Sequence, residues 1–316
     1  MNIAIIGAGL AGLHLASQLA SAHTVTVFEK ARGPGGRMST RRAAPYAFDH
    51  GAQYFTAATQ AFRDFLAPFL EDGTVAAWPD AIELSGGAVV SDKQKYAAAP
   101  GMNAICKTLA AGLDVRTGAR IETLQRAPDG WHVQIASGET EGPFDWVIST
   151  APAPQTAALL PDDFGPKERL AEVEMLGCFT LMLGFEAPPA ITWSAQKIGN
   201  SPVGWMAMNS EKPGREGAAS LVVQANNTWA EAHLEDDPAA VISTLLNAAS
   251  EYADQDLSTA PHQVLHRWRY AATRTPAGEA FLKDDALQLA ACGDWCLGSK
   301  VEAAFLSADA LAKDLL

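Results

Sequence analysis

The stretch that decides the fold is IAIIGAGLAG, at residues 3–12. Its apolar start predicts a buried β-strand that ends at Gly7. Apolar residues then recur at helical spacing, at Leu10, Leu13, Ala16 and Leu19. The alternating segment TVTVFEK, at 24–30, predicts a second strand. Because two parallel strands need a crossover connection, this unit of strand, helix and strand predicts an α/β sheet.

The glycines of GAGLAG, at 7–12, stand where a dinucleotide-binding turn needs them. Gly7 permits the tight turn, Gly9 lets a pyrophosphate approach the backbone, and Gly12 lets the helix pack against the strand. The free N–H groups and the positive dipole of the helix N-terminus favour phosphate binding. Glu29 ends the second strand and can accept hydrogen bonds from a ribose. Up to this point NAD and FAD fit equally well.

The next stretch, EKARGPGGR at 29–37, combines glycine with charge and favours FAD. The glycines at Gly33, Gly35 and Gly36 allow a loop to fold close to the cofactor. Arg37 supplies a planar cationic group that suits a pyrophosphate. A flexible surface turn is the alternative interpretation of the same glycines.

Charge and composition narrow the function classes. A net charge of −13 over 316 residues argues against nucleic acid or an anionic membrane as the main partner. No segment has the run of about 20 apolar residues that a membrane span needs, and no export signal is visible. The cysteines have neither redox nor zinc spacing, at Cys106, Cys178, Cys292 and Cys296. We expect a cytoplasmic protein with free thiols and no metal site.

The order of the predicted elements indicates a discontinuous domain organisation. An α/β start is followed by a β-rich middle, with one helix at 238–252, and by a final strand and helix. We predict an FAD-binding domain formed by 1–57, 98–158 and 278–316, and a substrate domain formed by 58–97 and 159–277. The predicted fold class is α/β, with a Rossmann-like domain and an inserted β-rich α+β domain.

Longer motifs give a family resemblance. EKARGPGGRMSTRR at 29–42, FDHGAQYF at 48–55 and CGDWCLGSKVEAAFLSA at 292–308 resemble the flavoprotein amine oxidase superfamily. VISTAP at 147–152 and ARIETL at 119–124 fit the same pattern. Within that superfamily the chain is most similar to the renalase family. The similarity rests on the motifs GAGLAG, GGRMST, DHGAQYFT, AAAPGMNAI and HRWRYA. The resemblance implies the amine oxidase, or p-hydroxybenzoate hydroxylase-like, fold.

The resemblance also implies the cofactor and its contacts. Non-covalent FAD is expected, because the superfamily's covalent flavin cysteine lies in a different sequence context. The implied FAD contacts include the fingerprint glycines. They are Gly7, Gly9, Ala11, Gly12, Glu29, Lys30, Gly36, Arg37, Gln53, Tyr54, Ile121, Gly293, Asp294, Val301, Glu302 and Ala303. The helix from Val301 is expected to point its positive end at the flavin.

Renalase-like enzymes are implied to oxidise the 2- and 6-dihydro isomers of NAD(P) to NAD(P)+, with O2 as acceptor and hydrogen peroxide as product. A dihydropyridine becomes aromatic on losing hydride, so flavin N5 can accept it without a general base. We therefore assign no catalytic side chain. The substrate-pocket candidates are Tyr54, His266, Trp268 and Tyr270. Core packing between sheet and helix is the alternative for the two aromatics of HRWRYA. Arg41 and Arg42 can meet a phosphate of cofactor or substrate, but solvated surface charge is the simpler interpretation of both.

Three other functions stay open on the sequence. The chain could be an amine oxidase acting on a small amine, or a desaturase or protoporphyrinogen-type oxidase. It could also be a nucleotide-binding protein without catalytic activity. The preferred dihydronicotinamide isomer, the 2′-phosphate preference, the oligomeric state and the physiological electron acceptor are not specified by the sequence.

Overall fold

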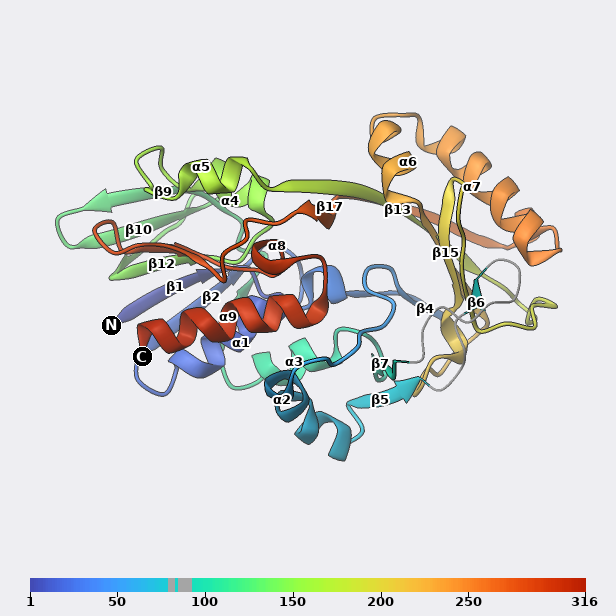
Figure 1. Cartoon of the computed structure of the whole chain (residues 1–316), viewed down its shortest axis with the longest axis horizontal. Helices are drawn as coiled ribbons and strands as arrows, with labels where there is room; N and C mark the ends of the chain where they lie inside the picture. Colours follow the sequence, from blue (N-terminus) through green and yellow to red (C-terminus); the bar gives the residue numbers. More distant parts are fainter. Residues whose placement is uncertain (79–82, 85–92) are drawn as a thin grey trace. The chain divides into compact units, whose positions relative to one another are not determined.

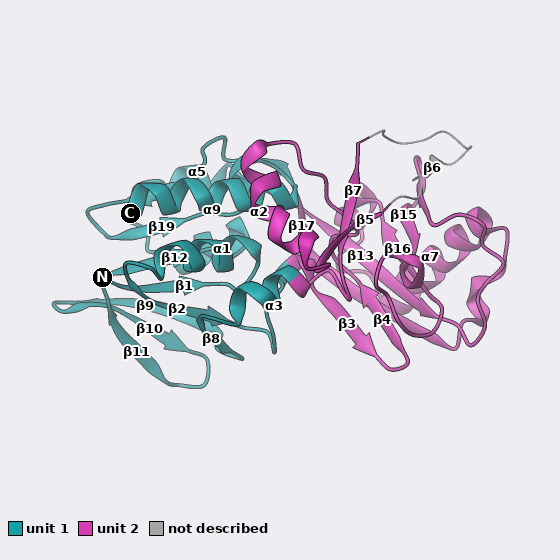
Figure 2. Cartoon of the chain, turned by 90° about the horizontal axis from the view of Figure 1, so that it is seen from below, with its two compact units in different colours: residues 1–36, 105–175, 273–316 teal, residues 37–104, 176–272 magenta. Residues whose placement is uncertain are grey.

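The computed structural model describes residues 1–78, 83–84 and 93–316. Contacts divide the chain into two compact units, coloured separately in Figure 2. Unit 1 is formed by 1–36, 105–175 and 273–316, and unit 2 by 37–104 and 176–272. Residues 37–57, which we predicted in the FAD-binding domain, belong to unit 2, and part of the predicted segment 58–97 lies outside the described residues. The division into domains stays a prediction.

Unit 1 is built on a mainly parallel sheet, as the opening motif predicts. The strand order is β18 (Leu282–Asp284), β19 (Leu289–Ala291), β12 (Trp146–Ser149), β1 (Asn2–Ile6), β2 (Thr24–Glu29) and β8 (Asp114–Thr117). The neighbours from β19 to β8 pair in parallel, and only the edge strand β18 is antiparallel. The strands β1 and β2 are joined by α1 (Leu10–Leu19), which confirms the predicted crossover.

The helix α1 is buried on nearly all sides because it contacts both the sheet and α9 (Val301–Leu315). Figure 1 shows α9 running alongside α1. The rings of His14 and Phe305 lie 4.4 Å apart at this contact, and His14 Nε2 is 3.5 Å from Asp309 Oδ1. The C-terminal helix therefore holds the helix that follows the glycine turn.

A second sheet of unit 1 is an antiparallel meander of β9 (Ile121–Ala127), β10 (Gly130–Ile135) and β11 (Thr140–Phe144). The chain passes from this sheet to the parallel sheet at Asp145, whose Oδ2 accepts the Asn2 N–H at 2.6 Å. Short helices complete the unit: α3 (Ala104–Ala110), α4 (Ala153–Leu159), α5 (Lys167–Ala171) and α8 (Asp294–Leu297).

Unit 2 contains the β-rich middle of the chain. Its sheet has the order β17 (His262–Thr275), β13 (Glu174–Gly184), β16 (Ser220–Ala225), β15 (Val203–Met208), β14 (Ala195–Lys197) and β6 (Glu83–Leu84). One face packs against α7 (Pro238–Ala253), which ends one residue beyond the predicted helix. Unit 2 also contains α2 (Gln60–Glu71), α6 (Asn227–Ala232) and the strand pair β5 (Val75–Trp78) and β7 (Lys95–Ala98).

The hairpin of β3 (Thr40–Ala43) and β4 (Tyr46–Asp49) was not predicted, because its strands are short and partly polar. It packs on the sheet through Phe48, which contacts Met182 and Val222. The helix α2 starts at Gln60. Its start is fixed by the Thr59 hydroxyl, which accepts the Phe62 N–H at 3.3 Å.

Candidate functional site

The turn between β1 and α1 requires two of its glycines for the fold itself. Gly7 has a φ of 112° and donates its N–H to the Phe28 carbonyl at 2.8 Å. A Cβ on Gly12 would lie 2.0 Å from the Gly7 carbonyl oxygen. Any larger residue at position 12 would therefore separate the helix from the strand.

Gly9 has a different environment, because a Cβ there would meet nothing within 4 Å. It precedes α1 and gives that helix no side-chain cap, so the first-turn N–H groups have no partner inside the helix. The loop that follows β2 closes on this turn: Gly35 donates to the Ala8 carbonyl at 2.9 Å, and Gly36 lies near the Gly9 Cα. The turn thus offers an open backbone cradle that fits a pyrophosphate.

The carboxylate of Glu29 connects the two loops. The side chain is buried, with Oε2 accepting the Ala8 N–H at 2.8 Å and Oε1 accepting the Ala31 N–H at 2.7 Å. A carboxylate has further lone pairs, so a ribose hydroxyl can still bind. The neighbouring Lys30 donates to Gln155 Oε1 at 3.0 Å, and Ile121 is half-buried at the start of β9.

The GD motif lies at the end of β19. The Gly293 N–H donates to Ser307 Oγ at 2.9 Å, and that hydroxyl donates to the Ala280 carbonyl at 2.6 Å. The Trp295 indole N–H donates to the Ala151 carbonyl at 3.0 Å. The structure therefore brings the VISTAP strand end and the GD motif together.

The helix α9 begins just beyond this motif. Its N-cap residue, Lys300, makes no side-chain cap, and its first turn contains the predicted cofactor residues Val301, Glu302 and Ala303. Glu302 and Asp294 are both buried. Carboxylates near a helix N-terminus are stabilised by its positive end.

In unit 2, the carboxylate of Asp49 is the centre of a buried ion cluster. Its Oδ2 is 2.5 Å from Arg215 Nη2 and 3.4 Å from Lys212 Nζ. Its Oδ1 accepts the Thr40 hydroxyl at 2.7 Å and the Met102 N–H at 2.9 Å. The side chain of Asp49 is completely buried. The cluster places two cations around one anion.

In this cluster, the attraction between opposite charges counteracts the effect of burial on the pKa values of Asp49 and Lys212. Burial alone would raise the pKa of Asp49, but Lys212 and Arg215 hold it below its usual value. Burial lowers the pKa of Lys212 to about 8, against the attraction of Asp49. A lysine with this pKa changes charge much closer to neutrality than an exposed one. Sequence reasoning missed Lys212 and Arg215, because nothing in the local segment EKPGRE indicates a buried partner.

The turn that follows Asp49 holds the next predicted residues. A Cβ on Gly51 would lie 1.9 Å from the Arg37 carbonyl oxygen, and the Ala52 N–H donates to that oxygen at 2.8 Å. The Gln53 amide is used within unit 2: Nε2 donates to the Asp49 carbonyl at 2.5 Å, and Oε1 accepts from Lys212 at 3.0 Å. The FDHGAQYF motif therefore fixes the backbone of Arg37 through Gly51 and Ala52.

Tyr54, a predicted contact of both cofactor and substrate, is half-buried in an aromatic group. Its ring centroid lies 5.4 Å from Trp205 and 6.4 Å from Trp78. Burial raises the pKa of its hydroxyl. The structure thus places Trp205 against a candidate site residue.

Three even-numbered residues of β17 form a half-buried aromatic strip: His266, Trp268 and Tyr270. The Trp268 indole N–H donates to the His50 carbonyl at 2.8 Å, and its ring stacks on His50 at 5.1 Å. The His50 and His266 rings meet edge to face at 4.8 Å. His50 was not among the predicted site residues, although it lies inside the FDHGAQYF motif.

The strip does not fill the core between sheet and helix, which was the alternative interpretation. Leu265, on the other face of β17, packs against the cluster that includes α7. Arg267 and Arg269 share that other face and pair with the exposed Glu235. Burial, His266 and Arg41 together lower the pKa of His50 to about 4, and burial and Arg41 lower that of His266.

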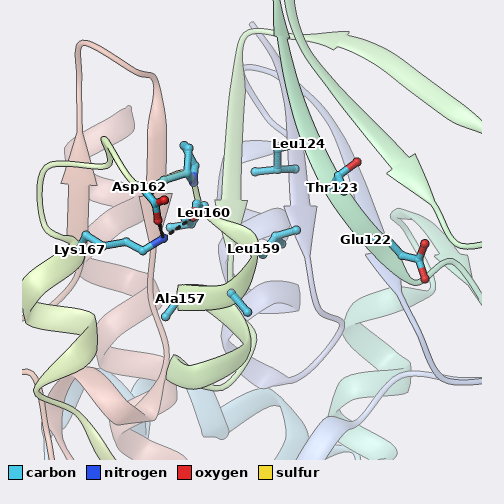
Figure 3. A pocket seen from close by; sticks show the side chains of 10 residues that line it. Glu122, Thr123, Leu124, Ala157, Leu159, Leu160, Asp162 and Lys167 are labelled. Atoms are coloured by element: carbon cyan, nitrogen blue, oxygen red, sulfur yellow. Dashed lines mark hydrogen bonds and ion pairs between the residues drawn. The ribbon is translucent and has the colours of Figure 1, made fainter.

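A surface hollow of about 480 Å³ lies elsewhere in unit 1, between β9 and the end of α4 (Figure 3). Lys167 stands on its rim, donating to the Leu160 carbonyl at 2.6 Å and pairing with Asp162 at 3.2 Å. None of the predicted site residues lines this hollow. It is therefore lined by a different set of residues.

The described part of the chain contains no group of three or more His, Cys, Asp or Glu side chains that could hold a metal ion. Burial raises the pKa of Cys106, Cys178 and Cys296 to about 12, and that of Cys292 well above its usual range. The thiols therefore stay protonated at neutral pH. Among the described helices, none is both long and apolar enough to cross a bilayer.

Comparison with known proteins gives a short local match in sequence. The 4,4'-diapophytoene desaturases (4,4'-diaponeurosporene-forming) of Staphylococcus aureus strains Newman and USA300 are 48% identical to this chain over 52 residues. That match covers 16% of this chain and 10% of each desaturase. The chain thus matches only a tenth of the length of these relatives.

Solved structures match the whole fold at low sequence identity. A putative protoporphyrinogen oxidase from Exiguobacterium has a TM-score of 0.79 at 13% identity, with 99% of this chain and 98% of that chain covered. Putrescine oxidase bound to putrescine has a TM-score of 0.70 at 12% identity, with 100% and 99% covered. At these identities the likeness is one of fold.

Family models cover most of the sequence. Residues 5–69 match an NAD(P)-binding Rossmann-like domain, and residues 82–316 match the flavin containing amine oxidoreductase model. These findings confirm the predicted fold class and FAD as the cofactor. The chain belongs to the flavin containing amine oxidoreductase family.

Proposed function

We propose that this protein is an FAD-dependent oxidase of the renalase type. It takes a hydride from 2- or 6-dihydronicotinamide isomers of NAD(P), releases NAD(P)+ and passes the electrons to O2, forming hydrogen peroxide. The observation that carries this proposal is the uncharged aromatic strip of β17 with His50 against it. Because the pKa of His50 is about 4, its imidazole is neutral at physiological pH.

The same strip is a poor site for an amine cation. Cationic amines are usually bound by carboxylates or by aromatic cages without a competing positive charge. The carboxylate next in sequence to His50 is Asp49, which is already bound to Lys212 and Arg215. The cation that acts on His50 and His266 is Arg41. A planar neutral ring suits these surroundings better than an ammonium group.

The residues around the two loops of unit 1 fit FAD. The open space beside Gly9 and the first turn of α1 would hold the pyrophosphate, and Glu29 the adenosine ribose. Asp294 would bind the ribityl chain, and the N-terminus of α9 would point at the flavin ring. In unit 2, we propose contacts from Arg37, the backbone at Gln53, and Tyr54. Ile121, Lys30 and Ala11 complete the proposed set.

The protein's own part in the reaction is to orient the substrate and exclude water. FAD, when bound, supplies the hydride acceptor. The dihydronicotinamide ring would stack on Trp268, whose indole is held by the His50 carbonyl. His266 can hydrogen-bond the carboxamide as a neutral imidazole. Because the ring gains aromaticity on oxidation, no side chain has to remove a proton.

The test is the flavin absorbance of the purified holoenzyme under anaerobic conditions. We expect 6-dihydro-NAD or the 2-dihydro isomer to bleach the flavin within one turnover, and air to restore its colour with release of hydrogen peroxide. Ordinary 4-dihydro-NAD and a panel of small amines serve as controls. Bleaching by an amine but by neither isomer would replace this proposal with the amine oxidase alternative.

A further inference from the structure

The hairpin of β3 and β4 separates two sets of side chains. The Thr40 hydroxyl donates a hydrogen bond to the Asp49 carboxylate, and both side chains lie on the hairpin face that carries the buried ion cluster. Phe48 and His50 lie on the opposite face: Phe48 stacks on His262 at 5.4 Å, and His50 meets His266. Successive side chains of a strand alternate between faces. The hairpin therefore presents one face to the ion cluster and the other to β17.

Arg41 belongs to the face that meets β17. It is paired across the hairpin with Phe48, whereas Arg42 is paired with Ala47. The preceding residue on the same face, Ser39, lies 3.4 Å from His50 Nε2 through its hydroxyl. Strand alternation thus places Arg41 beside the aromatic strip and Arg42 on the opposite face.

The charge of Arg41 acts on both imidazoles of the site. Its guanidinium contributes to the lowered pKa of His50 and of His266. Arg41 is exposed, and no carboxylate pairs with it in the part of the chain that the structure describes. Arg41 therefore provides a positive charge beside the aromatic strip that is available to an anionic group.

We propose that Arg41 binds the phosphate of a dihydronicotinamide nucleotide substrate whose ring lies against His266 and Trp268. This inference rests on the proposed function and names the group that selects a nucleotide over a free dihydropyridine. A guanidinium can donate two parallel hydrogen bonds to a phosphate, and it stays charged at any pH where the enzyme works. It gives this face of the hairpin a subsite for the anionic part of the substrate.

The experiment compares Arg41→Ala with Arg42→Ala in the purified holoenzyme. The substrates are 6-dihydro-NAD, the corresponding mononucleotide, and a 1-alkyl-1,6-dihydronicotinamide that carries no phosphate. For Arg41→Ala we expect KM to rise about tenfold or more for both nucleotides, because a charged hydrogen bond is lost. The kcat should stay within about twofold. KM for the alkyl compound should not change, and Arg41→Lys should recover part of the loss.

The matched control is Arg42→Ala, which removes the same charge from the same strand on the other face. An equal rise of KM in both variants, or a rise that is as large for the alkyl compound, would overturn the assignment of Arg41. Calorimetric binding of NAD+ and of 1-methylnicotinamide tests the subsite without turnover. If the wild-type enzyme oxidises no dihydronicotinamide, the proposed function fails. Unchanged NAD+ affinity in Arg41→Ala would in either case reject the phosphate subsite.

Discussion

Two buried carboxylates organise the two units in different ways. Glu29 in unit 1 accepts backbone N–H groups from Ala8 and Ala31, which are 21 and 2 positions away. Asp49 in unit 2 binds the side chains of Lys212 and Arg215, which are 163 and 166 positions away. The Glu29 site is made of backbone N–H groups from nearby in the sequence, whereas the Asp49 site is made of charged side chains from far along the sequence.

The difference has a thermodynamic consequence. A carboxylate that accepts backbone N–H groups leaves only neutral donors behind when its charge is removed. A carboxylate between two buried cations leaves uncompensated charge behind, which is far more costly. We therefore expect unit 2 to be more sensitive to the loss of its carboxylate than unit 1, and the predictions below test that contrast.

The largest effect is expected for Asp49→Asn. Breaking a buried ion pair on one side costs about 3–5 kcal/mol, and here two cations lose their partner. Thermal or denaturant unfolding of the holoenzyme measures this loss. The control is Glu235→Gln, which removes an exposed acid that also pairs with two arginines. Its cost should be much smaller, because solvent screens an exposed ion pair.

A double variant distinguishes charge from shape at this position. Adding Lys212→Met to Asp49→Asn removes one of the unpaired cations, so part of the lost stability should return. If the two substitutions are simply additive, the cluster is not held by charge and the contrast with Glu29 does not hold.

Acid should weaken the fold through His50. Its pKa is lowered to about 4 by burial, His266 and Arg41, whereas an unfolded histidine titrates near 6.5. Between these values the unfolded chain binds the proton and the folded chain does not, so stability falls as pH decreases from 6.5 towards 4. The loss is on the order of 3 kcal/mol. Denaturant unfolding at a series of pH values should show this slope, and His50→Asn should reduce it. An unchanged slope in that variant would assign the acid sensitivity to other groups.

In the glycine turn of unit 1, the effect of an alanine substitution should depend on which glycine is replaced. For Gly12→Ala we expect a loss of about 1–3 kcal/mol, because the new Cβ would lie 2.0 Å from the Gly7 carbonyl oxygen. Gly9→Ala has open space and should leave the stability of the apoprotein within about 0.5 kcal/mol of the wild type. It should still weaken FAD binding, which titration of the apoprotein with FAD measures. Tight FAD binding by Gly9→Ala would reject the proposed cradle.

The same contrast explains how far the sequence could predict the structure. The strand, helix and strand around Gly7 to Glu29 were predictable because their glycine spacing and apolar periodicity lie within one short segment of sequence. The hairpin that bears Arg41 was not, since its strands are short and partly polar. The pairing of Asp49 with Arg215 was not either, because the two residues are 166 positions apart. His50 lay inside a recognised motif, but only the three-dimensional structure places it against Trp268.

A smaller loss of stability than in Asp49→Asn is expected for Glu29→Gln. A glutamine has one carbonyl oxygen, so it can accept from Ala8 or from Ala31 but not from both through separate oxygens. The backbone donor left without a partner should cost about 1–2 kcal/mol, less than the loss in Asp49→Asn. Affinity for FAD should fall as well, because the ribose loses a charged acceptor. Parallel unfolding and FAD titrations of both variants measure the ratio of the two effects. If Glu29→Gln destabilised the protein as much as Asp49→Asn does, backbone donors and buried cations would be equally demanding partners for a carboxylate in this fold.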